Sequence, residues 1–392
     1  MNTKKQRLIF TILYLAYTSI YIARINLSMA GPELINLNLI DTVQLGALGS
    51  VFSTLYSFGR LINGGISDRT PPYIMLTTGL AVAGISNLLI GFFPPFIGIF
   101  ILWTANAYAQ SMLWSSVLCV VSSIYEKEVA KKKTSLMVTS VATGNILAII
   151  VSTFLIEKLG VAYAFIIPGL ITLILGALVL LSTKKVTPPP VEDKKHLSMV
   201  SLLKNKEIRL MLVPALFHGV MKENISLWMA VYVVDTFLVD LSQSSYYILL
   251  IPVIGLIGRM VYPLFYKLCK NSGNSVSLVG FLFCVIASVA LFFNSIGMVA
   301  SVLALSVIYA SVSVINTSIL SIYPMHFIKT GNVASVSGVM DFATYLGGGI
   351  ASAIYGVVIK NFGYFPMFAS WVVISLISIL FILKIKKSRK AN

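Results

Sequence analysis

Charged residues are scarce in this chain of 392 residues: they make up 11%, and only 13 residues are acidic. Hydrophobic residues make up 57% and the mean hydropathy is +0.91. A soluble domain carries about 25% charged residues, so this composition excludes that class. Cys119, Cys269 and Cys284 are the three cysteines, odd in number and without metal-ligand spacing. We therefore expect neither a disulfide framework nor a metal site.

The sequence also lacks a glycine-rich nucleotide-binding loop, so we expect no ATP-driven motor, no cofactor and no enzymatic activity. The net charge of +16 suggests nucleic-acid binding at first sight, but its distribution argues against it. Lys158 and Lys360 alone fall in segments predicted to be external, and most other basic residues fall in predicted cytoplasmic segments. This is the positive-inside pattern, which orients membrane helices.

What the chain does have is long apolar runs, each close to the ~20 residues that cross a bilayer core of about 30 Å. They predict an all-α protein of the cell (inner) membrane with twelve transmembrane helices, both termini cytoplasmic. A stretch rich in proline and charge, VTPPPVEDKK, predicts a flexible linker. We therefore expect an N-terminal six-helix bundle over 1–183, a cytoplasmic linker over 184–208 and a C-terminal six-helix bundle over 209–392. The predicted spans are 8–30, 43–66, 73–93, 97–121, 135–156, 161–182, 210–234, 245–266, 275–295, 297–323, 332–358 and 364–383.

Four basic residues interrupt these runs: Arg24, Arg60, Lys222 and Arg259. A cation in a membrane helix costs roughly 2.5–3.5 kcal/mol on insertion scales, so such residues usually have a function. Arg24 and Lys222 are 198 positions apart, and Arg60 and Arg259 are 199 apart. Short apolar matches recur at nearly the same offset, which indicates a duplication of six spans. In such a repeat the substrate site is expected between the halves near the midplane.

Aromatic and polar residues accompany the cations at helical spacing. Tyr17, Tyr21 and Arg24 share one helical face, Tyr56 lies one turn before Arg60, and His218 lies one turn before Lys222. Tyrosine hydroxyls beside a buried cation suit a phosphate or a carboxylate. The opposing interpretation is that internal carboxylates neutralise the cations, but only Glu223 and Asp341 lie within the predicted spans. We expect Arg24 and Lys222 to bind the anion.

Several roles stay open from the residues alone. Arg60 and Arg259 either bind the anion or form a gate or interdomain ion pair, and Asp341 either holds a cation in the empty carrier or carries a proton. In the fourth span, Asn106, Gln110 and Trp114 face a cavity or bond to neighbouring helices. In the eleventh, Gly347, Gly348 and Gly349 predict close helix packing, beside Tyr345 as a possible cavity residue.

The segment Gly64–Arg69 (GGISDR) resembles the signature of the major facilitator superfamily, which assigns Asp68 and Arg69 to a conformational gate. Other segments resemble one branch, the organophosphate:phosphate antiporters that carry glycerol phosphate and hexose phosphates. These segments are YIARINLSMAGPEL (21–34), LYSFGRLINGGISDRTPP (55–72), NAYAQSMLW (106–114), KENISLWMAVYV (222–233) and YLGGG (345–349). The resemblance places the family's phosphate-binding arginine on Arg24, and a tyrosine and a basic residue on Tyr56 and Arg60.

Three departures from the family affect the substrate more than the anionic class. Lys222 replaces the second phosphate-binding arginine, Thr143 replaces the histidine of the fifth span, and Ile25 replaces a further basic residue of some members. A lysine keeps the charge but loses the planar fork of arginine. His218 is then the nearest histidine candidate.

Together these features predict a monomeric secondary transporter of a phosphate-bearing organic anion, with the lipid bilayer and a small anion as its partners. Exchange with inorganic phosphate is implied by the resemblance alone. Two alternatives stay open: a proton-coupled carrier of another organic anion, such as a sugar acid or carboxylate, and a transport-inactive sensor of sugar phosphate.

Overall fold

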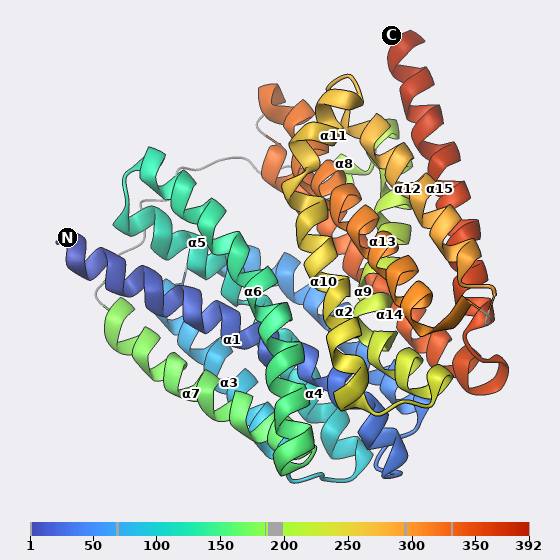
Figure 1. Ribbon diagram of the computed structural model, residues 1–392. Coiled ribbons are helices and arrows are strands. Elements are labelled where there is room, and N and C mark those ends of the chain that lie inside the picture. Colours follow the sequence, from blue (N-terminus) through green and yellow to red (C-terminus); the bar gives the residue numbers. More distant parts are fainter. Residues whose placement is uncertain are drawn as a thin grey trace. The chain divides into compact units, whose positions relative to one another are not determined.

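The computed structural model describes residues 2–67, 70–184, 186, 199–293, 296–330 and 332–391. Within these ranges the chain is helical and contains no strand (Figure 1). The helices are α1 (Thr3–Asn36), α2 (Thr42–Ser67), α3 (Pro72–Ile90), α4 (Phe96–Ser111), α5 (Leu113–Ile124), α6 (Lys127–Leu159), α7 (Tyr163–Thr183), α8 (Met199–Leu202), α9 (Lys206–Phe237), α10 (Leu241–Met260), α11 (Tyr262–Leu268), α12 (Gly273–Ala290), α13 (Gly297–Thr317), the π-helix η2 (Ser318–Ile322), the 3₁₀-helix η3 (Tyr323–Thr330), α14 (Val333–Phe362) and α15 (Phe365–Ala391).

Helix ends follow local sequence signals. The side chain of Asn205 accepts hydrogen bonds from the backbone N–H groups of Glu207 and Ile208 and so caps the start of α9. Gly160 directly follows the last residue of α6 and Gly363 that of α14, with φ of 100° and 70°. Glycine adopts such angles without steric cost. Because these glycines close the segments EKLG and KNFG, the two predicted halves share the same helix stop.

The helices group into two compact units: unit 1 comprises Met1–Gln44 and Phe58–Asp193, and unit 2 comprises Leu45–Ser57 and Lys194–Asn392. The first part of α2 therefore packs with the helices of unit 2. The predicted division at 184–208 remains a prediction.

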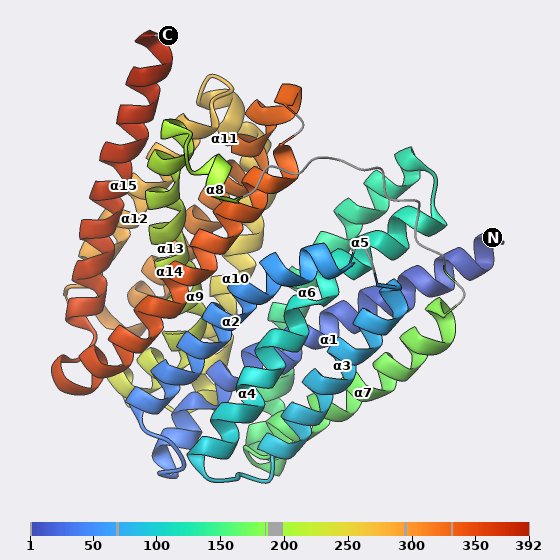
Figure 2. The same cartoon turned by 180° about the vertical axis from the view of Figure 1, so that it is seen from behind.

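Neighbouring helices repeat from one unit to the next. In unit 1, α1 packs against α6 and α7, and α3 packs against α7. In unit 2, α9 packs against α14 and α15, and α12 packs against α15 (Figure 2). The matching neighbours are what a six-helix duplication predicts.

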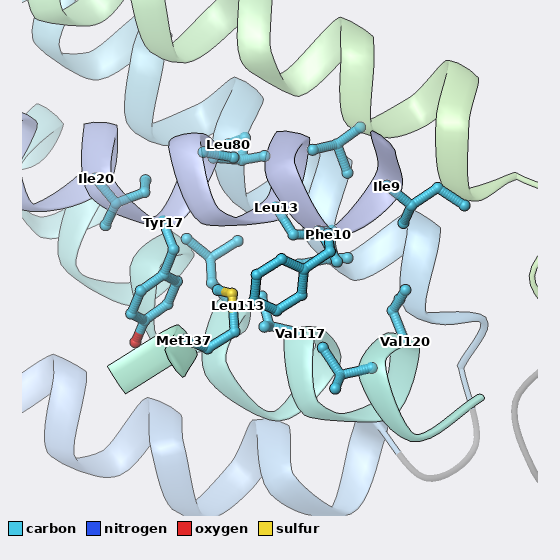
Figure 3. Packing of buried hydrophobic residues seen from close by; sticks show 14 of the residues in the cluster. Ile9, Phe10, Leu13, Tyr17, Ile20, Leu80, Leu113, Val117, Val120 and Met137 are labelled. Atoms are coloured by element: carbon cyan, nitrogen blue, oxygen red, sulfur yellow. The ribbon is translucent and has the colours of Figure 1, made fainter. Parts of the chain in front are cut away.

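In unit 1 the packing is built on one face of α1. Ile9, Leu13, Tyr17 and Ile20 recur every three or four residues and point into a buried cluster with side chains of α3, α5, α6 and α7 (Figure 3). Lipid tails are as apolar as leucine, so close van der Waals contact rather than escape from water holds these helices together. The cluster fixes which side of α1 faces the bundle.

Ten helical segments of the described residues are long and apolar enough to cross a membrane. Every predicted span overlaps a helix, but α2 and α9 are not among these ten. Both carry polar residues along their length, including Arg60 in α2 and His218, Lys222 and Glu223 in α9. The all-helical class is confirmed; the number of twelve spans and the cytoplasmic termini remain predictions.

Three spans are less regular than the sequence predicts. Met112 separates α4 from α5, and Val261 separates α10 from α11, where Pro263 stands in the first turn. The tenth span changes from α13 to a π-helix and then a 3₁₀-helix. Such interruptions depend on how neighbouring helices satisfy the freed backbone groups, which hydropathy does not report.

Helices α9 and α14 approach each other closely at Gly219. A Cβ atom on Gly219 would collide with the backbone carbonyl of Thr344, and one on Gly347 with the carbonyl of Leu216. The predicted packing role of the glycine run is thereby confirmed.

We expect Gly219→Ala to lower the stability of the folded protein by about 2–3 kcal/mol, because a backbone group cannot swing aside as a side chain can. The melting temperature in detergent would measure this. Gly338→Ala, also in unit 2, is the matched control, since nothing lies within 4 Å of the added Cβ. Equal melting temperatures for both variants would contradict the close approach.

Candidate anion-binding site

In unit 1 the predicted face of α1 is present as an aromatic row leading to Arg24. The rings of Tyr17 and Tyr21 lie 5.7 Å apart, and Arg24 Cζ lies 6.0 Å from the centre of the Tyr21 ring. That distance is the outer limit of a cation–π contact. Tyr17 is buried and Arg24 is partly buried. The guanidinium therefore lies near one tyrosine ring in a partly buried position.

Two further helices complete this row. The Trp114 ring, from α5, lies 5.2 Å from the Tyr17 ring. One turn before Tyr17 on α1, the Tyr14 hydroxyl shares hydrogen bonds with Thr139 (3.0 Å) and Thr143 (3.1 Å) of α6. Thr143, which stands where the family resemblance places a histidine, thus serves as a hydroxyl partner that ties α6 to α1.

In unit 2, Lys222 of α9 has an internal counter-ion. Its Nζ lies 3.0 Å from Glu223 Oε1, and the two side chains are 19% and 9% exposed. The counter-ion interpretation therefore holds for Lys222 in this structure. A partly buried ion pair is sustained because separating either charge from its partner is costly.

The same ammonium also faces a pair of tyrosine rings. Lys222 Nζ lies 4.4 Å from the centre of the Tyr345 ring of α14, and the Tyr56 ring lies 4.7 Å from that of Tyr345. Tyr56 comes from the part of α2 that belongs to unit 2. The structure thus brings together three predicted site residues: Tyr56, Lys222 and Tyr345.

His218, another predicted site residue, lies inside the helix packing of unit 2. It is fully buried, and its Nε2 lies 3.1 Å from the backbone carbonyl of Val312 in α13. A carbonyl only accepts hydrogen bonds, so Nε2 carries the proton and donates it. Nδ1 has no hydrogen-bond partner among the described residues. This geometry ties α9 to α13; a role in binding substrate remains a prediction.

Three other predicted residues are partly buried in their helices: Arg60 in α2, Arg259 in the last turn of α10 and Asp341 in α14. Asp341 lies one turn before Tyr345 and so on the same side of α14. The predicted gate residues Asp68 and Arg69 lie outside the described residues.

The polar residues of the fourth span bond to protein groups. Gln110 Nε2 donates to Asn106 Oδ1 at 3.0 Å, and Asn106 Nδ2 lies 3.5 Å from the carbonyl of Ala23 in α1. Both side chains are buried. Of the two roles left open by the sequence, the interhelical one describes the contact of Asn106 with α1, whereas the Gln110–Asn106 bond lies within α4.

Two buried asparagines that the sequence patterns did not single out orient the cation-bearing helices. Asn26 and Asn224 each follow a predicted cation by two residues and are 0% exposed. Asn26 donates to Asn87 Oδ1 (2.8 Å), and Asn224 donates to the carbonyls of Val220 and Gly348. Two residues correspond to about 200° around a helix. Each asparagine thus holds the side opposite its cation against the bundle. Asn26 and Asn224 are 198 positions apart, the same offset as between the two cations, and this match could have identified them from the sequence.

Comparison with known proteins gives one family match and several partial relatives. The family profile described as Major Facilitator Superfamily matches residues 13–352. A probable hexose phosphate transport protein of Chlamydia pneumoniae is 28% identical over 193 residues, which cover 48% of this chain and 42% of that protein. A glycerol-3-phosphate transporter of Bacillus subtilis is 28% identical over 238 residues, covering 57% and 52%. The chain thus spans about half the length of these relatives.

The fold also matches solved structures. A bacterial homologue of the human lysosomal transporter Spinster, inward-facing and occupied, superposes with a TM-score of 0.79 at 14% identity. The match covers 99% of this chain and 98% of that one. At this identity the likeness concerns the fold alone.

Proposed function

Because the chain belongs to the Major Facilitator Superfamily, and so is a multi-pass membrane protein that in a bacterium resides in the inner membrane, we propose that it carries a phosphate-bearing organic anion. One observation carries the proposal: each unit holds a partly buried cation beside tyrosine rings, at positions equivalent in the repeat. Sugar phosphates and glycerol phosphate are the expected substrates, in keeping with the names of the relatives. Exchange with inorganic phosphate is part of the proposal.

In the proposed mechanism Arg24 binds the phosphate from unit 1 and Lys222 binds it from unit 2. Arginine offers a planar fork to two phosphate oxygens, whereas Lys222 acts as a compact charge. A ligand drives a conformational change only by binding the two states with different affinity. Contacts made to both cations at once in the intermediate between the inward- and outward-open states would stabilise that intermediate and so lower the barrier to exchange. The predicted gate roles of Asp68, Arg69, Arg60 and Arg259 belong to the same proposal.

Binding and counterflow test this function together. Inorganic phosphate, glycerol 3-phosphate and glucose 6-phosphate are added to purified protein, with citrate and gluconate as carboxylate controls. A ligand at 100 times its dissociation constant should stabilise the folded state by about 2.7 kcal/mol. We expect stabilisation by phosphate compounds, and uptake of labelled phosphate into proteoliposomes that contain unlabelled phosphate.

Other outcomes would contradict the proposal. Stabilisation by the carboxylates alone, with transport that stops when the pH gradient is dissipated, would identify the proton-coupled alternative. Binding of phosphate compounds without counterflow would identify the sensor.

Glu223 competes with the ligand for Lys222 in this mechanism, because both offer oxygen atoms to one ammonium group. We expect Glu223→Gln to lower the dissociation constant for inorganic phosphate about tenfold, equivalent to about 1.4 kcal/mol. Titration calorimetry on purified protein measures this constant. Glu207→Gln, at the start of the same helix, is the matched control and should leave it unchanged. A weaker affinity in Glu223→Gln would show that Glu223 assists binding instead.

A further inference from the structure

Unit 2 contains an apolar groove that the proposed transport mechanism does not use. It has a volume of about 210 Å³ and lies among α10, α11, α12 and α13. Ala310, Ser311 and Val314 of α13 contribute to its lining, together with residues of α10 and α12. Gly258 and Gly280 also line it, so side-chain bulk is missing from both α10 and α12 at this level.

The chemistry of the lining selects a hydrocarbon. Ser311 is the one lining residue with a polar side chain, and its hydroxyl donates to the carbonyl of Val307 at 2.8 Å. An apolar cavity of about 150 Å³ in a protein binds benzene, so the larger groove has room for part of an acyl chain. Two lining side chains, Ile257 and Phe283, are 51% and 43% exposed. The groove is therefore accessible from outside the unit.

Basic residues lie near the α11–α12 end of this groove. Phe265 of α11 and Val276 of α12 line that end. Lys267, in the last turn of α11, and Lys270, two residues after the end of that helix, are exposed. Lys386 Nζ reaches the same place, because it donates to Ser275 Oγ at 2.9 Å. The sequence from 241 to 340 contains no aspartate or glutamate. No carboxylate within residues 241–340 is therefore present to neutralise Lys267 or Lys270.

The α11–α12 connection also lies at the correct depth for a lipid headgroup. Both Leu241–Met260 and Gly273–Ala290 are candidate membrane spans, so the segment between them emerges at a membrane surface. Lysines at that level attract anionic lipids with about 1 kcal/mol per residue, or about fivefold in affinity. An acyl groove with lysines near one end fits one molecule that is apolar at one end and anionic at the other.

We propose that this groove binds an anionic phospholipid, with an acyl chain among α10, α12 and α13 and its phosphate at Lys267 and Lys270. The lipid is a ligand separate from the transported anion, and the inference does not depend on the proposed function. The bound lipid would contact four helical segments of unit 2. Because it would bind the folded state and not the unfolded one, it would stabilise that unit.

Native mass spectrometry of the full-length protein in detergent tests the site with phosphatidylglycerol and phosphatidylcholine of identical acyl chains. We expect phosphatidylglycerol to bind at least tenfold more tightly. Val279→Trp fills the groove and should remove most binding of phosphatidylglycerol, whereas Leu282→Trp, exposed on the same helix, should not. Lys267→Gln with Lys270→Gln should reduce the preference for phosphatidylglycerol about 10- to 30-fold. Lys360→Gln is the control for loss of a positive charge.

Four results would overturn the proposal. These are equal binding of the two lipids, unchanged binding in Val279→Trp, an unchanged preference in the double lysine variant, and a dimer that closes the groove in place of lipid. The lysine variants alter exposed side chains, so they remain informative if Val279→Trp folds poorly. Free inorganic phosphate in excess distinguishes a lipid site from a simple phosphate site, because it should not displace the bound lipid.

Discussion

Replacing Arg24 with alanine should lower the rate of phosphate exchange in proteoliposomes about 10- to 150-fold. A hydrogen bond to a charged group contributes about 1.5–3 kcal/mol, and this range corresponds to that loss in rate if the contact is made in the transition between states. Arg24→Lys keeps the charge and should lose less. The Tyr21 ring, 6.0 Å from the guanidinium, would remain to face the shorter side chain.

Arg7→Ala is the matched control because Arg7 lies on the same helix and is exposed. Exchange is measured as uptake of labelled phosphate, and the melting temperature of each variant verifies folding. Exchange by Arg24→Ala within twofold of the unmodified protein would remove Arg24 from the binding site.

The second large effect is expected at Lys222, where function and stability can be separated. Lys222→Met should reduce exchange by a similar factor, about 10- to 150-fold. It should also destabilise unit 2, because Glu223 would keep a mostly buried charge without its lysine. Lys222→Arg should restore exchange, since it supplies both charge and the fork.

A double variant distinguishes the two effects. Lys222→Met with Glu223→Gln removes the isolated carboxylate, so the melting temperature should recover while exchange stays low. If exchange recovered together with stability, Lys222 would be a structural residue, and the anion site would have to be sought elsewhere. Such a cycle is appropriate because the two side chains are in direct contact.

Long apolar runs were sufficient to predict helices, because a bilayer accepts only segments that satisfy their own backbone groups. The breaks at Met112 and Val261 could not be predicted, since each depends on neighbours from other helices. The apolar run at 210–234 predicted the helix α9, but α9 is not among the candidate membrane spans, because its charged and polar residues weaken the apolar signal that identifies a span.

For the site, the spacing of Tyr17, Tyr21 and Arg24 was sufficient to predict one helical face. The Lys222–Glu223 pair shows what spacing cannot give. Adjacent residues on a helix point about 100° apart, so only flexible side chains bring them to 3.0 Å. His218 occupied the predicted turn, yet its partner is a backbone carbonyl in α13, and backbone carbonyls leave no trace in a sequence pattern. The binding roles themselves remain predictions.

The position of Trp114 should make the intrinsic fluorescence of the protein sensitive to anion binding. Of its four tryptophans, Trp103, Trp228 and Trp371 are 2%, 1% and 0% exposed. Trp114 is partly buried and its ring lies 5.2 Å from that of Tyr17, in the row that leads to Arg24. An anion that displaces water there should shift the indole emission of Trp114 and leave the other three nearly constant. A ligand-induced shift in emission that is lost in Trp114→Phe but kept in Trp371→Phe would thus report that the site is occupied, without any added dye.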